Sequence, residues 1–202
     1  MTMPPAIVIF DLGGVLIDWD GANGLRELLG DAFSPEAARK FWLESPAVRS
    51  FESGRSTSDE FARKAVEELS LSMSPDEWFR QFFSWDRGPF PGSSDLLSAL
   101  ESKCELGCLS NNNELHWSQI KDHWGFGRFF RYQYLSHEIG MIKPDPEIFE
   151  YVLRDLGVPP ERILYLDDNP ECVEAALKFN LRAAKARGLN EVRQVLSSVG
   201  LL

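Results

Sequence analysis

The stretch IVIFDLGGVLIDWD, residues 7–20, decides the fold class, because an unbroken apolar run ends on a single carboxylate, Asp11. Continuous apolar runs of this length, bounded by polar residues, are typical of strands buried in a parallel sheet. Two residues further on, where paired-acid chemistry would need a second carboxylate, the chain has Gly13. The stretch therefore predicts a buried strand that presents one acid at its end, and it leaves open whether that acid works alone.

Three more apolar runs end in polar residues in the same way, and a weaker one follows near the C-terminus. They are LGCLS before Asn111, RYQYLS before His137, RILYL before Asp167, and LRAAKA at residues 181–186. Helix starts lie between them, with capping boxes at residues 57–60 and 74–77 and Pro-led starts at residues 145–147 and 169–171. This alternation predicts an open, Rossmann-like parallel α/β sheet with helices on both faces.

One region interrupts the alternation. Residues 21–88 carry helical patterns and no convincing strand, and glycine-rich stretches mark both borders, DGANG at 20–24 and GPFPG at 88–92. We expect a small helical bundle inserted after the first strand, with residues 1–20 and 89–202 forming the α/β domain. Most of the insert's many aromatic side chains should form the bundle core, and a few could line a pocket.

The composition limits the partners. A formal net charge of −10 and a sequence pI near 4.8 argue against nucleic acid and anionic membranes, which would be repelled. We find neither a signal peptide nor a stretch of membrane-spanning length. An odd set of cysteines (Cys104, Cys108 and Cys172) without framework spacing favours a reduced, cytoplasmic protein. The expected partner is a small molecule, which, if anionic, needs a cation or donors at its site.

Ligands of open α/β sheets bind at the carboxyl ends of the strands. The polar residues that follow the four runs should meet there: Asp11, Ser110 with Asn111, Lys143, and Asp167 with Asp168. Oxygen ligands without His or Cys favour Mg²⁺ over zinc, and a lysine and a hydroxyl suit a phosphoryl group. A carboxylate at this edge can attack phosphorus and form an aspartyl-phosphate, so Asp11 is the candidate nucleophile.

The motifs FDLGGVL, LSN, GMIKPDPEIF and YLDDNPE, in this order, resemble the haloacid dehalogenase-like (HAD) superfamily. The resemblance covers the sheet domain, and the helical insert falls where that superfamily carries a helical cap. The sequences of the later motifs are most similar to those of small sugar-phosphate phosphatases, including alpha-D-glucose-1-phosphate phosphatase-like members. The resemblance implies a Mg²⁺-dependent hydrolase of small phosphorylated metabolites, a monomer or homodimer, which acts through an aspartyl-phosphate intermediate.

The resemblance also implies a role for each of these positions. Asp11 matches the nucleophile, Ser110 and Asn111 match the phosphate-binding motif, and Lys143 matches the lysine that holds nucleophile and phosphate together.

For the metal, Asp11 and Asp168 match Mg²⁺ ligands, and Asp167 either shares that role or pairs with the motif's lysine. The backbone carbonyl of Gly13 can serve as a further ligand. Cys172 stands where the family pattern leads us to expect Asn, which puts the local geometry of the metal motif in question.

The main departure is Gly13, because phosphatases of the superfamily usually carry a second Asp there as general acid. General acid–base catalysis contributes roughly 10²–10⁴-fold, so its loss would slow turnover without removing phosphoryl transfer. Asp18, just downstream, is one hypothetical substitute, although a solvated turn residue is the simpler interpretation. Arg49 and Arg55 of the insert could meet an anionic or hydroxyl-rich group, or pair with surface acids.

Three alternatives deserve comparison. A strict haloacid dehalogenase would be expected to carry Ser-Ser-Asn where this chain has Asp167-Asp168-Asn169. A catalytically weak or dead phosphate-binding protein finds its support in Gly13 alone. A dinucleotide-binding enzyme lacks support, because the first turn is not Gly-x-Gly-x-x-Gly. The three histidines (His116, His123 and His137) are interpreted as surface or packing residues.

Overall fold

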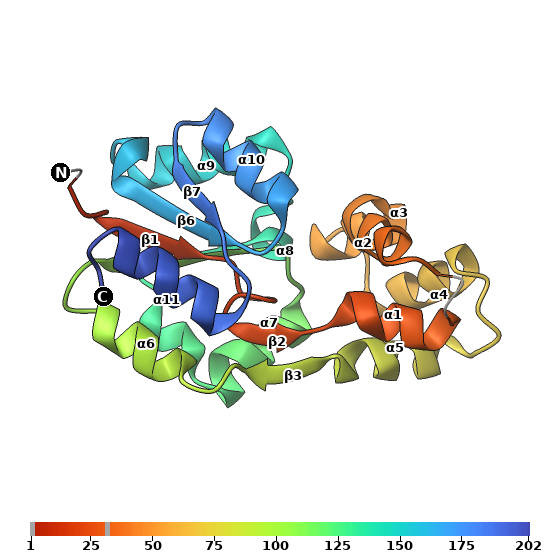
Figure 1. Cartoon of the computed structure of the whole chain (residues 1–202). Coiled ribbons are helices and arrows are strands. Elements are labelled where there is room, and N and C mark those ends of the chain that lie inside the picture. The colour runs from red at the N-terminus through yellow and green to blue at the C-terminus, as the bar shows by residue number, and fades with distance from the viewer. Residues whose placement is uncertain (1–2, 31–32) are drawn as a thin grey trace.

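The computed structural model describes residues 3–30 and 33–202, which form an α/β lobe and a helical lobe (Figure 1). The α/β lobe is built on a five-stranded parallel sheet in the order β5-β4-β1-β6-β7. Its strands are β1 (Ile7–Phe10), β4 (Glu105–Ser110), β5 (Tyr132–Leu135), β6 (Ile163–Asp167) and β7 (Arg182–Lys185). The strands predicted from the apolar runs are all present, and the weak candidate at 181–186 is the edge strand β7.

Helices cover both faces of the sheet, as the alternation predicted (Figure 1). One face carries α6 (Ser93–Leu100), α7 (Glu114–Ser118), the π-helix η1 (Gln119–His123), the 3₁₀ turn η2 (Phe126–Phe129) and α11 (Gly188–Ser198). The other carries α9 (Pro146–Leu156) and α10 (Pro170–Lys178). The short elements α8 (Ser136–Ile139) and η3 (Pro160–Arg162) lie in the connections before α9 and β6.

The central strand β1 has apolar side chains on both faces, so a layer of helices must cover each face of the sheet. Val8 and Phe10 point into the cluster under α6 and α11, whereas Ile7 and Ile9 point into the cluster under α9 and α10. All four side chains are at most 1% exposed. Burying each apolar side chain of this size contributes about 1.5–3 kcal/mol, so both layers stabilise the strand that carries Asp11.

The helical lobe contains α1 (Gly21–Leu29), α2 (Pro35–Glu44), α3 (Pro46–Glu52), α4 (Ser58–Glu68) and α5 (Pro75–Ser84). Both predicted capping boxes are present, at the starts of α4 and α5. The lobe has its own aromatic core, in which Phe61, Trp78 and Phe82 are buried. The aromatic residues of the insert therefore serve mainly as packing, as expected.

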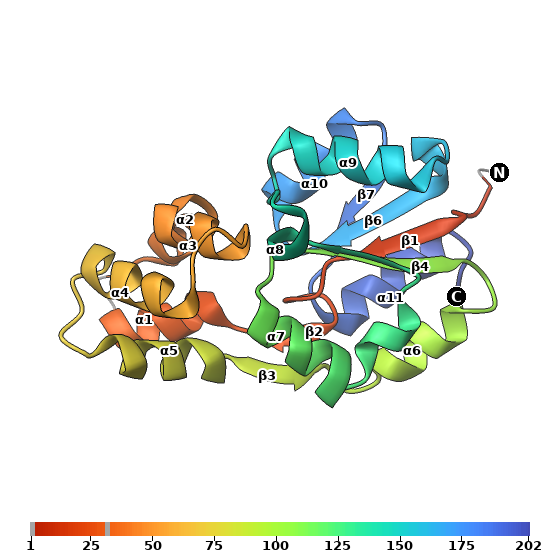
Figure 2. The same ribbon diagram turned by 180° about the vertical axis from the view of Figure 1, so that it is seen from behind.

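A two-stranded antiparallel ribbon joins the lobes (Figure 2). It pairs β2 (Ile17–Trp19) with β3 (Asp86–Pro89), so both chain crossings lie side by side. The expectation of no strand within residues 21–88 was wrong at its end, because β3 begins at Asp86. Its sequence, DRGP, contains Gly and Pro and has no strand propensity, so pairing with β2 creates this strand.

Within residues 3–30 and 33–202, none of the helices combines the length and apolar character that a membrane crossing requires.

Candidate active site

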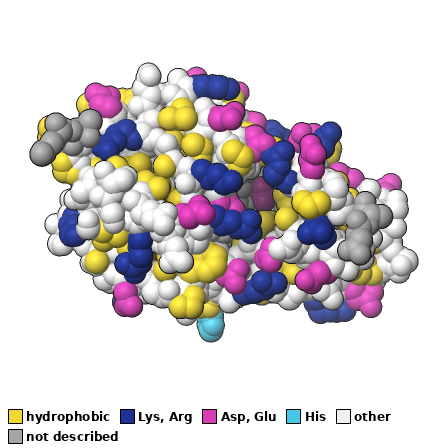
Figure 3. All heavy atoms as spheres, viewed as in Figure 1, with side chains coloured by type: hydrophobic (Ala, Val, Ile, Leu, Met, Phe, Trp, Pro, Cys, Tyr) yellow, Lys and Arg dark blue, Asp and Glu magenta, His cyan; other side chains and the backbone are white. Residues whose placement is uncertain are grey.

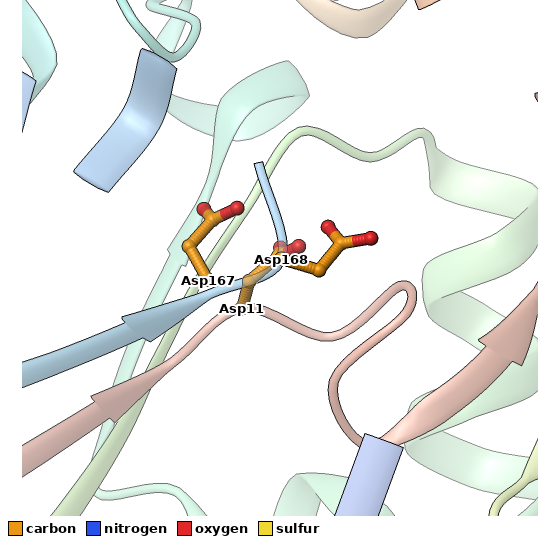
Figure 4. A group of neighbouring side chains, drawn as sticks. All are labelled: Asp11, Asp167 and Asp168. Carbon is orange, nitrogen blue, oxygen red and sulfur yellow. The ribbon is translucent and has the colours of Figure 1, made fainter. Parts of the chain in front are cut away.

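The carboxyl ends of the central strands bring the predicted acids together. Asp11 follows β1 directly, and its backbone N–H bonds the carbonyl of Leu166 at 2.8 Å, so it lies beside the end of β6. Carboxylate oxygens of Asp11, Asp167 and Asp168 lie within 4.8 Å of one another. Figure 4 shows Asp167 and Asp168 turned to opposite sides of the end of β6, with Asp11 between them on the neighbouring strand end. The parallel register thus produces a compact group of oxygen donors.

Gly14 makes room for this group. A Cβ at position 14 would lie 2.4 Å from a carboxylate oxygen of Asp168, closer than real contacts allow. The backbone φ of Gly14 is +74°, in the left-handed region that side chains disfavour. A glycine is therefore required here both by space and by conformation.

Lys143 reaches the acids from the loop after α8. Its Nζ lies 2.9 Å from Oδ1 of Asp11 and 2.7 Å from Oδ2 of Asp167, and its side chain is 3% exposed. Burial alone would lower the pKa of Lys143, but the carboxylates of Asp11 and Asp167 raise the pKa above its ordinary value. The lysine is thus held as a cation at the bottom of the site.

Asn111 fixes the backbone of that lysine. Its side-chain amide donates to the carbonyl of Lys143 at 2.9 Å and accepts from the N–H of Lys143 at 2.8 Å. The family resemblance implies that Asn111 takes part in phosphate binding, and Asn111 lines the cavity while its side-chain oxygen and nitrogen each bond the backbone of Lys143. Its side chain is therefore a positioning group, whereas Ser110 stands buried at the end of β4 and lines the cavity.

The carboxylates differ in how they are held. Asp167 accepts hydrogen bonds from Lys143, from the hydroxyl of Tyr165 and, at 2.8 Å, from the N–H of Asn169. It is therefore engaged by protein groups, which matches the pairing that the sequence analysis left open. Asp168 lies on the opposite side of the strand end, next to Gly14.

Burial and mutual repulsion act against the charged forms of these carboxylates. Burial, against the opposing charge of Lys143 and with added repulsion from Asp167 and Asp168, raises the pKa of Asp11 to about 7. Burial and the neighbouring Asp167 likewise raise the pKa of Asp168 to about 6, against Arg187. Crowded carboxylates with raised pKa values are what a hard divalent cation relieves, and the donor set of oxygens suits such an ion.

Cys172 lies at the start of α10, where it also lines the cavity. It is 3% exposed and packs in the core cluster under α9 and α10, where burial raises the pKa of its thiol. The loop before it keeps its shape through Asn169, whose side chain caps the N–H of Glu171 at 3.0 Å. The thiol is thus a packing group at the start of α10.

A cavity of about 490 Å³ opens over the acids, between the two lobes. Trp19, Trp42 and Phe82 from the ribbon and the helical lobe supply apolar walls, and Asn112, Asn113 and His116 add polar groups. Figure 3 shows this face of the molecule hollowed between the lobes, with Lys and Arg side chains around the hollow. Arg39, Lys185 and Arg187 line the cavity. Basic side chains therefore lie among the carboxylates of the cavity wall, although Arg39 is itself paired with Glu171.

Position 13 itself carries no side chain. A Cβ there would be 3.5 Å from the Cβ of Trp19, an ordinary contact, and Gly13 lines the cavity. Asp18 does not line the cavity, whereas its strand neighbours Ile17 and Trp19 do, because side chains alternate along β2. The hypothesis that Asp18 replaces the missing acid therefore has no geometric support.

The helical lobe contacts the α/β lobe at several points around the cavity. Arg49 pairs with Asp145 at 2.6 Å, and Arg39 pairs with Glu171. These partners belong to the α/β lobe, so the arginines join the two lobes.

The turn after α3 also contacts the α/β lobe. Arg55 donates to the carbonyl of Gly140 at 3.2 Å. Gly54 lies so close to the carbonyl of His137 that a Cβ would approach its oxygen to 2.4 Å. Arg55 thus binds a main-chain carbonyl of the α/β lobe. The absence of a side chain at Gly54 allows the turn to pack closely against α8.

Two cavity residues were missed as candidates by the sequence analysis. Glu52, the last residue of α3, lines the cavity, and burial raises the pKa of its carboxyl to about 8. His116 is 5% exposed, stacks on Phe83 and contacts Phe82 at a tilted angle, and burial lowers the pKa of its imidazole to about 4. Neither residue sits in a motif, and only the packing of the lobes brings them to the site.

A parallel sheet that gathers three carboxylates and a buried lysine at its carboxyl edge, beneath a helical lobe, defines an α/β enzyme with an acidic centre. Residues 5–180 match the family model of the haloacid dehalogenase-like hydrolases. The chain belongs to this family.

Among curated relatives, the chain is 24% identical to D-ribitol-5-phosphate phosphatase of Bacteroides thetaiotaomicron, over 95% of this chain and 97% of that enzyme. It is 28% identical to phosphoglycolate phosphatase of Pseudomonas putida, over 85% of this chain but 65% of that enzyme. A HAD family enzyme of B. thetaiotaomicron, solved with magnesium and inorganic phosphate, superposes with a TM-score of 0.71 at 27% identity, covering 91% of this chain and 94% of that one.

Proposed function

We propose that this hydrolase is a Mg²⁺-dependent phosphatase of small phosphomonoesters, with Asp11 as the nucleophile. One observation carries the proposal: the carboxylate of Asp11 lies at the base of the cavity between the ammonium of Lys143 and the carboxylate of Asp168. The relatives named as phosphatases, one of them similar over almost the whole chain, support this assignment.

The donors fit a magnesium ion. Asp11 and Asp168 would hold it, with the main-chain carbonyl of Gly13 as a neutral third ligand; Asp167 is already engaged by Lys143 and Tyr165. A bound Mg²⁺ would polarise the phosphoryl group and neutralise the charge that develops on its oxygens. The solved relative that holds magnesium and phosphate supports this choice of metal.

The protein's own groups account for the remaining requirements. A carboxylate oxygen of Asp11 attacks phosphorus, and the ammonium of Lys143, 2.9 Å away, orients that carboxylate and attracts the anionic substrate. We assign to the hydroxyl of Ser110 a hydrogen bond to a phosphoryl oxygen, because this residue lines the cavity at the end of β4. Asn111 holds the lysine backbone in position.

The helical insert, residues 21–88, is proposed to act as the cap domain over an α/β domain of residues 1–20 and 89–202. Its contacts through Arg49 and Arg55 would hold it closed over the cavity and keep water from the reaction. The cavity of about 490 Å³ has the size of small-ligand sites, and its mixed aromatic and polar walls suit a sugar or polyol phosphate. The free cysteines support work in a reducing compartment.

Two alternatives are weaker. A haloacid dehalogenase needs no metal, so three carboxylates crowded within 4.8 Å would be a liability there. L-2-haloacid dehalogenases superpose at 21% identity, which speaks for a shared fold alone. A catalytically dead phosphate-binding protein would have no use for a carboxylate at the anion's position, since that charge repels phosphate.

The test is an activity screen with and without metal. Sugar phosphates, polyol phosphates, other phosphomonoesters and haloacids are assayed in EDTA and in MgCl₂, with Asp11→Asn as the control. The proposal expects phosphate release that needs Mg²⁺ and disappears in Asp11→Asn. Metal-independent halide release would instead identify a dehalogenase, and no turnover of any phosphomonoester would favour the binding protein.

A further inference from the structure

Gly13 leaves the site without a proton donor beside the nucleophile. A donor would therefore have to come from another residue that lines the cavity. Apart from the three clustered aspartates, the carboxyl groups that line it are Asp20, Glu52 and Asp86. A general acid has to reach the oxygen that leaves phosphorus, and it must be able to hold a proton at neutral pH.

Asp20 and Asp86 are engaged on the ribbon. Asp20 accepts from Asn23 at 3.1 Å and from Arg87 at 3.3 Å. Asp86 accepts from the N–H of Gly88 at 3.4 Å. Besides burial, the neighbouring carboxylate that raises the pKa of Asp86 is that of Asp18. Both acids therefore serve the joint between the lobes.

Glu52 is differently placed. The charged groups that act on its carboxyl are Lys143 and Asp11 from the sheet edge and Arg49 from its own helix. Among the residues that the structure describes, no hydrogen bond contributes to its ionisation. Glu52 lines the same cavity as Asp11 and Lys143, so its side chain borders the space that a bound molecule would occupy.

The surrounding contacts fix this position. Arg49, three residues before Glu52, pairs with Asp145 at 2.6 Å, and Arg55, three residues after it, bonds the carbonyl of Gly140. Gly54, two residues after it, lies against the carbonyl of His137. The end of α3 is therefore attached to the α/β lobe on both sides of Glu52.

We propose that Glu52 is the catalytic acid and base of this enzyme, supplying from the helical lobe the proton that position 13 cannot supply. This inference rests on the phosphatase function proposed above.

The step balances as follows. A carboxylate oxygen of Asp11 forms a bond to phosphorus while the bond between phosphorus and the ester oxygen breaks, its electron pair staying on that oxygen. The carboxyl proton of Glu52 passes to the same oxygen, so an alcohol leaves and Glu52 becomes a carboxylate. Glu52 then takes a proton from the water that attacks phosphorus. The Asp11–phosphorus bond breaks, which restores both side chains and releases inorganic phosphate.

The electrostatics agree with this use. Burial raises the pKa of Glu52 to about 8; Lys143 opposes the rise, Asp11 adds to it, and Arg49 opposes it. In the protein without bound metal, burial therefore favours the protonated form of Glu52, which is the form that a donor needs. Once it has given up its proton, the nearby ammonium of Lys143 stabilises the carboxylate until water restores it.

Leaving-group dependence provides the test. Glu52→Gln is compared with wild type on a sugar or alkyl phosphate, whose alkoxide needs a proton, and on 4-nitrophenyl phosphate, whose phenolate leaves without one. Because Glu52 also acts as base in the second step, which both esters share, the compared rate is that of Asp11 phosphorylation in a single turnover. We expect this rate to fall roughly 10²–10⁴-fold on the alkyl ester and to change by a few-fold at most on the nitrophenyl ester. Glu44→Gln, an exposed glutamate on α2, is the matched control and should leave both rates unchanged.

Two outcomes would overturn the inference: equal losses on both esters, which indicate a binding or structural role, or no loss on either. The first outcome also covers a variant that folds badly, so retained phosphorylation of Asp11 by the nitrophenyl ester is itself the evidence of an intact site. The phosphatase proposal fails separately, if wild type itself shows no Mg²⁺-dependent turnover of either ester.

The pH profile adds a second readout. Because the donor must be protonated, the wild-type rate of Asp11 phosphorylation by the alkyl ester should decline at alkaline pH as Glu52 loses its proton, whereas the rate with the nitrophenyl ester should not. Glu52→Gln should lack the alkaline decline on both esters. If the decline on the alkyl ester persists in Glu52→Gln, another group is the acid.

Discussion

The ammonium of Lys143 lies 2.9 Å from a carboxylate oxygen of Asp11, and both groups are buried at the bottom of the cavity. The same ammonium is 2.7 Å from Asp167, so one lysine serves two acids. This pairing keeps the nucleophile oriented and offers the approaching phosphate a positive charge. It also makes the lysine a structural element, because its removal would leave buried carboxylates without a partner.

Lys143→Met should therefore reduce both stability and activity. Removing one partner of a buried ion pair costs about 3–5 kcal/mol, since the remaining charge is left uncompensated. We expect a loss of this order in the free energy of unfolding in denaturant without Mg²⁺, together with loss of phosphatase activity. Lys40→Met, which breaks an exposed pair on α2, is the control and should change stability by less than about 1 kcal/mol. An unchanged unfolding curve for Lys143→Met would contradict the pairing.

Gly14→Ala tests whether the space beside Asp168 is needed for metal binding. The added methyl group would lie 2.4 Å from a carboxylate oxygen of Asp168, so that carboxylate must move. We expect Mg²⁺ affinity, measured by calorimetry, to fall roughly 10–100-fold.

Gly157→Ala separates this effect from backbone strain. Gly157 also has a positive φ, +63°, but has open space around it. The Gly157→Ala variant should lose about 1–2 kcal/mol in the free energy of unfolding and keep the metal affinity of wild type. Equal metal affinity in the two variants would show that Asp168 does not bind the ion.

Gly54→Ala tests the contact that brings Glu52 to the site. Its methyl group would lie 2.4 Å from the carbonyl oxygen of His137 and would push the end of α3 away from the α/β lobe. We expect kcat/KM to fall on the order of 10²-fold, because a shift of about 1 Å misaligns groups from both lobes. Gly125→Ala, with the same φ of +70° and no atoms within 4 Å, should retain activity. Wild-type kcat/KM in Gly54→Ala would show that catalysis does not require this contact between the helical lobe and the α/β lobe.

The titration of Glu52 should also be visible in stability without any turnover. Because burial raises the folded-state pKa to about 8 from an ordinary 4.5, the folded protein binds this proton more tightly. That contribution is complete below about pH 4.5 and is lost as the pH rises through 8. In EDTA, Glu52→Gln should gain stability relative to wild type as the pH rises from 5 to 9. A constant difference in unfolding free energy over this range would show that Glu52 is ionised throughout.

The chain itself predicted most of the sheet and the acidic centre. The apolar runs that end at Asp11, Ser110 and Asp167 predict buried parallel strands. Parallel strands have their carboxyl ends at one edge of the sheet. The meeting of these residues with Lys143 follows from that topology, without any knowledge of side-chain contacts.

Three features were out of reach because they depend on contacts between distant segments. The strand β3 contains Gly and Pro and exists through its pairing with β2. The side chain of Asn111 turns to the backbone of Lys143, which a motif cannot reveal. Glu52 is one of many acids in the helical insert, and only the docking of α3 against α8 selects it.

The most direct test of the account is to locate the phosphoryl group during turnover. Wild type is mixed with Mg²⁺ and a ³²P-labelled substrate, quenched in acid within milliseconds, digested and mapped by mass spectrometry. We predict label on the peptide that contains Asp11, and none when Asp11→Asn is used or when EDTA replaces Mg²⁺. Steady turnover with no label on Asp11, or with label on another residue such as Ser110, would contradict the assignment of Asp11 as the nucleophile.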